Sequence, residues 1–172
     1  FLSALTAAVS DQLPGESIGC YLSGGTDSST VAGMVTQVTG KPVKTFSIGF
    51  DAAGYDEMAY ARIAARRFNT DHTEYYITPG DLIERIPQVA ASFDQPFGNS
   101  SALPAYFCAR LAHDAGVTRM LAGDGGDELF GGNSRYASDK LFVAYEHVPA
   151  VLKRALIEPL AQPRKALEQR FD

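Results

Sequence analysis

The sequence lacks the features of several common protein classes. Its 172 residues include only two cysteines, Cys20 and Cys108, which form neither a C-x-x-C pair nor a disulfide framework. Both lie in apolar patterns, so we predict buried, reduced core thiols and a cytoplasmic protein. No apolar stretch approaches the roughly 18–20 residues that cross a bilayer, and no signal peptide is visible. The sequence therefore predicts no membrane partner.

Positive charge is also scarce. The formal net charge is −5, and the basic pairs at residues 66–67 and 153–154 are too short to neutralise a phosphate backbone. Nucleic acid is therefore not an expected partner. The three histidines, His72, His113 and His147, show no metal-ligand spacing and are expected to be structural or at the surface. The length is that of a single domain, and because the chain begins without Met and ends in mid-pattern, we expect a piece of a longer protein.

Short apolar strands alternate with helix-compatible stretches along the chain. The patterns predict strands at residues 18–22, 43–50, 72–77 and 117–122. They predict helices at 1–13, 28–38, 56–68 with Asp56 as the N-cap, 79–91, 101–115, 136–146 and 150–160. Strands separated by helices form right-handed crossovers, so we expect an α/β fold with an open parallel sheet and helices on both faces. Ligands bind such sheets beyond the carboxyl ends of the strands.

A glycine turn follows the first predicted strand. Residues 23–28 read S-G-G-T-D-S, and strand, glycine turn and helix start are the elements of an anion site. Gly24 and Gly25 let the backbone approach a ligand and adopt positive φ angles, while serine hydroxyls and the first helical N–H groups attract phosphate. No Walker A loop is present, and Asp27 inside the turn repels phosphate unless a cation lies between them. The turn therefore predicts a polyphosphate bridged by Mg²⁺.

A second glycine-rich segment follows the fourth predicted strand. Residues 122–132 contain five glycines and three acidic residues, Asp124, Asp127 and Glu128. A mobile acidic loop is the plain interpretation, but the dense glycines, and a Leu129-Phe130 pair that we expect to be buried among them, favour a binding loop. Carboxylate oxygen is the ligand that Mg²⁺ prefers. Two acidic turns at adjacent strand ends therefore predict a site that holds Mg²⁺-polyphosphate between them.

Together the two segments resemble the synthetase domain of the asparagine synthetase family, within the PP-loop ATP-pyrophosphatase superfamily. Residues 23–28 match the pyrophosphate-binding loop S-G-G-x-D-S, and residues 123–132 match the more specific signature G-[ED]-G-x-D-E-x-F-G-G. Residues 45–50, 55–57 and 93–97 are also similar to family segments in the family's order. The resemblance implies an adenine nucleotide alpha hydrolase-like fold over the whole chain.

The resemblance also implies a reaction in two steps. ATP and Mg²⁺ activate a carboxylate, most simply that of aspartate, as an acyl-adenylate with loss of pyrophosphate, and ammonia from a glutaminase domain then displaces AMP. By motif position, Asp124 lies near the reacting carboxyl group, and Asp27 and Asp127 hold Mg²⁺. Pyrophosphate is bound by Ser23, Gly24, Gly25, Asp27 and Ser28, and the adenosine pocket is lined by Leu22, Ile48, Ala122 and Gly123.

Alternatives remain open within and beyond this family. β-Lactam synthetases and peptide cyclases use an internal amine, and a nucleotide-binding module without catalysis would carry the same motifs. A tRNA-thiolating or lysidine-forming enzyme is disfavoured by the missing C-x-x-C motif and by the net negative charge. Gln95 and Asn99 stand where relatives often carry acids, which would alter carboxylate specificity if that loop touches substrate. Relatives also carry an N-terminal glutaminase domain and a longer C-terminal part with a Lys near the phosphates, both outside this sequence; a homodimer is left open.

Overall fold

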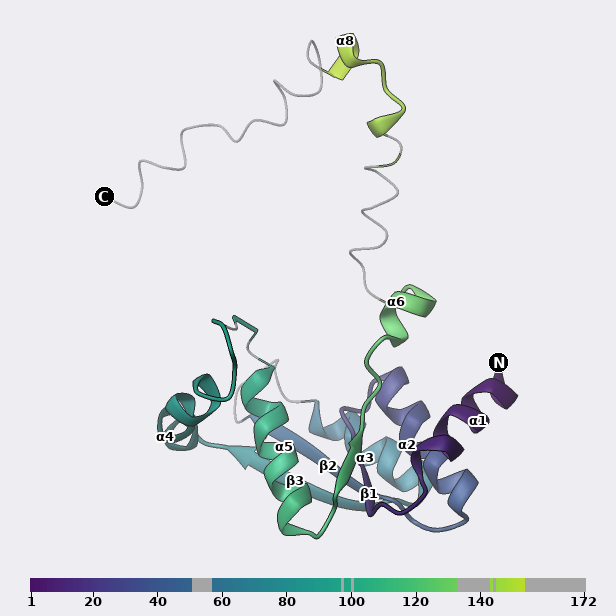
Figure 1. The fold of residues 1–172 in the computed structure, drawn as a ribbon, viewed down its shortest axis with the longest axis vertical. Helices are drawn as coiled ribbons and strands as arrows, with labels where there is room; N and C mark the ends of the chain where they lie inside the picture. Colours follow the sequence, from purple (N-terminus) through teal and green to yellow (C-terminus); the bar gives the residue numbers. More distant parts are fainter. Residues whose placement is uncertain (51–56, 97, 100, 133–142, 144, 154–172) are drawn as a thin grey trace. The chain divides into compact units, whose positions relative to one another are not determined.

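The chain forms two compact units, residues 1–125 and residues 126–172. The computed structural model describes residues 1–50, 57–96, 98–99, 101–132, 143 and 145–153. Among these residues, no helix is both long enough and apolar enough to cross a membrane. The first unit holds all four strands of the described sheet (Figure 1).

Those four strands form one parallel sheet. They are β1 (Ile18–Tyr21), β2 (Lys44–Phe50), β3 (Asp71–Ile77) and β4 (Arg119–Leu121), in the order β3-β2-β1-β4. The chain moves outward from β1 through β2 to β3 and then returns to the other side of β1 for β4. Because the direction of winding reverses between β1 and β4, the carboxyl ends of these strands border the crevice where open α/β sheets bind ligands.

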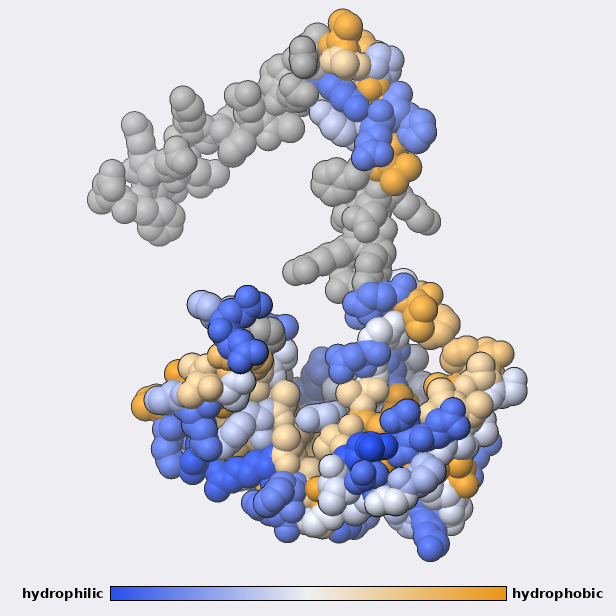
Figure 2. Space-filling view, in the orientation of Figure 1, coloured by the Kyte–Doolittle hydropathy of each residue, from blue (hydrophilic) through white to orange (hydrophobic). Residues whose placement is uncertain are grey.

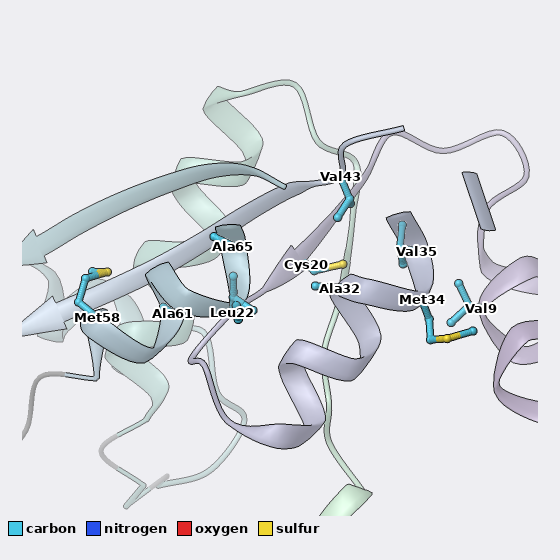
Figure 3. Packing of buried hydrophobic residues seen from close by; sticks show 11 residues of the cluster. Val9, Cys20, Leu22, Ala32, Met34, Val35, Val43, Met58, Ala61 and Ala65 are labelled. Atoms are coloured by element: carbon cyan, nitrogen blue, oxygen red, sulfur yellow. The ribbon is translucent and has the colours of Figure 1, made fainter. Parts of the chain in front are cut away.

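Helices cover both faces of the sheet, as predicted. Helices α1 (Leu2–Gln12), α2 (Thr26–Thr39) and α3 (Met58–Phe68) share one apolar core with Cys20 and Leu22 of the β1 side (Figure 3). On the other face, α5 (Ala102–Asp114) packs on β2 around Phe46 and Cys108, and α4 (Pro79–Ala90) packs on α5. Successive strand residues point to opposite faces, so β1 and β4 each contribute side chains to both cores.

Local signals set three of the helix ends. Gly40 and Asn69 adopt left-handed conformations after α2 and α3. Thr78 and Asp81 form a reciprocal capping box at the start of α4. In the second unit, the described helices are the short α6 (Gly126–Phe130) and α8 (Ala150–Leu152), so the predicted helices at 136–146 and 150–160 lie largely outside the described residues.

Two predicted helix starts need correction. Helix α2 begins at Thr26, two residues earlier than predicted, so Asp27 lies in its first turn and not in the preceding loop. The reason is that Ser28 turns back to bond with Ser23 and leaves Gly25 at the N-cap. Helix α3 begins at Met58 with Glu57 at the N-cap; Asp56, the predicted cap, lies outside the described residues.

The histidine on β3, His72, has a largely buried side chain. The side chain of His72 on β3 is 10% exposed, and its Nδ1 lies 2.9 Å from Thr45 Oγ1 on β2. Its Nε2 has no hydrogen-bond partner among the described residues and lies 3.7 Å from Glu74 Oε1, which Arg62 of α3 also pairs with. Burial lowers the pKa of His72, and the positive charge of Arg62 adds to this while Glu74 opposes it.

Lowering the pH from about 7 to about 5 should therefore reduce the free energy of unfolding. The folded-state pKa of His72 lies below its unfolded value of about 6.5. As the pH falls, the unfolded chain therefore binds the proton before the folded chain does, and the free energy of unfolding decreases. Glu74, whose lowered pKa is due mainly to Arg62, acts only in the more acidic range. Urea unfolding across this pH range should give a flatter dependence for His72→Gln, whereas exposed His113→Gln should match the wild type. Identical slopes for His72→Gln and wild type would contradict this assignment.

Candidate functional site

The loop between β1 and α2 is held by its own serines. The Ser23 N–H donates to Ser28 Oγ at 3.2 Å, and the two hydroxyl oxygens lie 3.0 Å apart. The Gly25 N–H donates to Ser23 Oγ at 3.2 Å, and the Ser28 hydroxyl donates to the Gly25 carbonyl at 3.4 Å. These bonds join the loop to the first turn of α2.

The two glycines of this loop have different roles. Gly24 has a φ of +84°, and a Cβ atom there would lie 2.3 Å from the Tyr60 carbonyl carbon and 2.4 Å from the Ala61 nitrogen. The loop thus rests directly on the backbone of α3. Gly25, by contrast, has a φ of −67° and is extended, so the prediction of a positive φ is right for Gly24 and wrong for Gly25. An N-cap residue needs extended backbone, which explains the difference.

The start of α2 presents anion-binding groups beside a carboxylate. Its Gly25 N-cap provides no side-chain bond to the first helical N–H groups, which leaves them available to a ligand. Asp27 in this turn makes no hydrogen bond or ion pair with a described residue. Gly123, after β4, packs against the same turn, because a Cβ atom there would lie 2.7 Å from Asp27 Cβ and 2.8 Å from the Ser28 nitrogen. The ends of β1 and β4 therefore meet.

A cavity of about 460 Å³ lies between α4 and α5, and a larger one of about 660 Å³ lies at this meeting point. Of the eleven residues that the sequence predicts for the site, eight line the larger cavity: Leu22, Ser23, Asp27, Ser28, Ile48, Ala122, Gly123 and Asp124. Gly24 and Gly25 lie in the adjoining loop and form its backbone. Gln95 and Asn99, which we considered as substrate contacts, line the smaller cavity instead.

Sequence analysis missed a further part of the cavity wall. These residues come from the ends of β1 and β2 and from the first turns of α3 and α5: Tyr21, Phe46, Ser47, Phe50, Glu57, Met58, Ala61, Ser101, Pro104, Ala105 and Cys108. Position was a sequence signal for them, because every helix that follows a strand in a parallel sheet begins at the ligand-binding edge. Four of them also lie in the segments 45–50 and 55–57 that resemble the family. Apolar side chains there resemble ordinary core residues in the sequence.

The charges around the larger cavity are all of one sign. Asp27, Glu57 and Asp124 are lining residues, and no Lys or Arg is among the described residues that line it. A phosphate ligand placed here would meet carboxylates and so requires a bridging cation. The unpaired carboxylate of Asp27 is a suitable oxygen donor for Mg²⁺. Among the described residues, no group of three or more His, Cys, Asp or Glu side chains is already arranged as a metal site.

The remaining predicted residue, Asp127, belongs to the second unit. It lies in the first turn of α6, where a Cβ atom at Gly132 would collide with its carboxylate. Its convergence with Asp27 on one metal ion stays a prediction. Leu129 and Phe130, expected to be buried, are 78% and 65% exposed, and Figure 2 shows apolar surface over α6. That expectation was wrong because a five-residue helix cannot bury its own apolar face.

Both cysteines are buried, as predicted. Cys20 is fully buried and Cys108 is 6% exposed, and burial raises the pKa of each thiol to about 12. Such thiols stay protonated and unreactive at neutral pH. Cys108 lines the larger cavity but donates its S–H to the Phe46 carbonyl at 3.7 Å. Neither thiol is therefore a candidate nucleophile, and the chemistry of the site depends on its carboxylates and donors.

Comparisons with known proteins identify the family of this chain. The family model described as asparagine synthase matches residues 1–171. A Methanocaldococcus jannaschii protein, described provisionally as a glutamine-hydrolysing asparagine synthetase, is 44% identical over 116 residues, which cover 67% of this chain and 22% of that protein. The glutamine-hydrolysing asparagine synthetase 1 of Bacillus subtilis is 33% identical over 144 residues, covering 84% of this chain and 22% of that protein. The chain thus spans less than a quarter of either relative's length.

Among solved structures, NMN synthetase from Francisella tularensis is similar with a TM-score of 0.48 and 23% sequence identity, covering 66% of this chain and 49% of that chain. The family assignment rests on the sequence matches, which extend over both glycine-rich segments and over nearly the whole chain. The chain belongs to the asparagine synthase family.

Proposed function

We propose that this chain is the ATP-binding part of a ligase that converts a carboxylate into an amide through an acyl-adenylate. The observation that carries the proposal is the cavity at the end of β1 and β4. There a glycine loop closed by its own hydrogen bonds and the free N–H groups of α2 lie beside the unpaired carboxylate of Asp27. Loss of pyrophosphate from ATP requires that the leaving phosphates be held and their charge offset. These groups supply that function.

The proposed roles follow the position of each residue around the cavity. The loop residues Ser23, Gly24, Gly25 and Ser28 bind the pyrophosphate portion of ATP through hydroxyl and backbone N–H donors. Adenosine lies against the apolar and backbone surface of the remaining lining residues from the sequence prediction, Leu22, Ile48, Ala122 and Gly123. Asp27 and Asp127 hold Mg²⁺, which when bound offsets phosphate charge and orients the leaving group.

Different residues of this chain act in the two chemical steps. In the first, an oxygen of the substrate carboxylate attacks the α-phosphorus and the bond to pyrophosphate breaks, while the loop and the α2 N–H groups stabilise the departing phosphates. In the second, the amine nitrogen attacks the acyl carbon and the bond to AMP breaks. Asp124, at the cavity edge beyond β4, accepts the proton that the nitrogen loses. No protein nucleophile is required.

For the substrates, we propose aspartate and ammonia, with asparagine, AMP and pyrophosphate as products. The names of the two sequence relatives support this assignment, and their glutamine hydrolysis supports a glutaminase domain as the source of ammonia. A cytoplasmic location is consistent with the buried, protonated thiols. These assignments concern the complete protein that carries the chain.

ATP–pyrophosphate exchange in the complete protein tests the proposal. Aspartate should support exchange of radiolabelled pyrophosphate into ATP, in a screen that also includes glutamate, β-amino acids and peptide carboxylates. Exchange that needs a carboxylate other than aspartate would retain the mechanism and correct the substrate. If no carboxylate supports exchange while Mg²⁺-ATP still binds, acyl-adenylate formation is ruled out and a non-catalytic nucleotide-binding module is the better description.

The two aspartates after β4 should have separable effects. Asp127→Asn should impair exchange itself, because the residue acts on the metal and the phosphates. Asp124→Asn should keep appreciable exchange but lower amide formation about tenfold to a hundredfold, since only the second step needs a proton acceptor. Both rates can be measured on the same preparations. Equal loss of exchange in the two variants would contradict this division and favour a shared role in metal binding.

A further inference from the structure

Three side-chain donors that line the larger cavity, on β2 and α5 and just before α5, are already engaged within the protein. The Ser47 hydroxyl donates to the Leu22 carbonyl, and the Ser101 hydroxyl donates to Asn99 Oδ1 at 2.8 Å. The Cys108 thiol is engaged with the Phe46 carbonyl. These three donors line the cavity, yet each is already committed to a protein acceptor. A ligand oxygen in this part of the cavity therefore needs another partner.

Tyr21 supplies that partner. It is the last residue of β1, and its ring packs into the α5-side core with Phe46 and Cys108 while still lining the cavity. No described residue accepts a hydrogen bond from its hydroxyl. Burial, with the nearby negative charge of Asp124 as a smaller cause, raises the pKa of the phenol, so the hydroxyl stays a donor at neutral pH.

The sheet register explains why Tyr21 and Asp124 share this wall. Parallel pairing aligns Cys20 of β1 with Leu121 of β4, and both side chains belong to the core on the α2 side. The next residue of β1, Tyr21, therefore points to the opposite face, as Met120 of β4 does. Asp124 follows just beyond the end of β4 and lines the same cavity. A neutral donor and a carboxylate thus lie at adjacent strand ends.

We propose that the Tyr21 hydroxyl donates a hydrogen bond to the acyl oxygen of the substrate during amide formation; this inference rests on the function proposed above. When the amine nitrogen forms its bond to the acyl carbon, the carbonyl electron pair moves onto the oxygen, and the phenolic O–H stabilises that charge. The pair then returns as the bond to AMP breaks, and the nitrogen passes its proton to Asp124. A carboxylate such as that of Asp124 cannot stabilise the acyl oxygen in this way, because an ionised carboxylate only accepts hydrogen bonds.

Tyr21→Phe in the complete protein tests this assignment, with Tyr106→Phe as the matched control. Phenylalanine keeps the ring and its packing and removes only the hydroxyl. Tyr106 lies on α5, which also lines the cavity, but Tyr106 is not a lining residue and its hydroxyl donates to Gln88 Oε1. The measurements are the KM for ATP, exchange with the carboxylate identified in the screen, the rate of amide formation at saturating ammonium chloride, and the melting temperature.

We expect Tyr21→Phe to lower the rate of amide formation about tenfold or more, with the KM for ATP and the melting temperature unchanged. Tyr106→Phe should match the wild type in every measurement. A wild-type rate of amide formation in Tyr21→Phe would overturn the assignment, and so would a parallel loss of ATP affinity and thermal stability, which indicates a packing role. Absence of exchange in the wild type would instead reject the proposed function, and this inference with it.

Discussion

Asp27→Asn is expected to lower the affinity for Mg²⁺-ATP by at least about a hundredfold, since even outer partners of a metal ligand contribute 10–100-fold. The change removes the negative charge but keeps the size of the side chain. Asp27 lies in the first turn of α2, lines the cavity and has no protein partner among the described residues, so the fold does not depend on its charge. Isothermal titration of the isolated chain with ATP in excess Mg²⁺ measures the effect directly.

The control for this experiment is Asp11→Asn, because Asp11 is an exposed aspartate on α1, away from the cavity. It should leave both the affinity and the melting temperature unchanged. In the wild-type chain, replacing Mg²⁺ by excess EDTA should weaken ATP binding to a similar extent as Asp27→Asn. Equal affinity with and without Mg²⁺ would show that no cation bridges Asp27 and phosphate.

Gly24→Ala should destabilise the first unit by about 2–4 kcal/mol, because two costs add. The first is the φ of +84°, a conformation that an L-residue adopts only with strain. The second is steric, since the new methyl group would lie 2.3 Å from the backbone of Tyr60, and a helix backbone cannot move aside as a flexible side chain can. Urea unfolding should show a lower midpoint, and ATP binding should be lost as the loop separates from α3.

Gly25→Ala is the matched control for Gly24→Ala. Gly25 has extended backbone at a φ of −67°, and a Cβ atom there would approach only Ser23 Oγ, at 3.3 Å. We expect a change of less than about 1 kcal/mol, the range of a mild N-cap substitution. If both variants lost the same stability, glycine content and not the packing of the loop on α3 would be the cause.

The fold could be predicted largely from the sequence because its signals are local. The apolar run at residues 18–22 and the β-branched run at 43–50 are strands, and Gly40 and Pro42, which follow α2, end that helix. Alternation of such strands with helices leaves few topologies. Helix starts were less certain: the start of α2 depends on a bond between Ser28 and Ser23, which no periodicity reveals.

The site could be predicted where chemistry leaves a sequence motif. Six residues of the S-G-G-T-D-S run and of the segment after β4 line the larger cavity, and so do Leu22 and Ile48, which the family resemblance adds. Tyr21 was missed because a tyrosine at a strand end is an ordinary core residue in a sequence, and Glu57 was given no role although it lies in the family-like segment 55–57. Only the register of β1 with β4 and the packing of the loop on α3 bring them to the cavity.

The cavity draws its walls from five separate stretches of the first unit, residues 21–28, 46–50, 57–61, 101–108 and 122–124. A nucleotide that contacts all five stretches holds together segments that are spread over roughly a hundred residues of the chain. Its binding free energy adds to the stability of the whole unit and not to one loop. The three-residue strand β4 pairs only with β1 among the described strands, so a nucleotide that contacts residues 122–124 gives the end of this strand a second attachment to the unit.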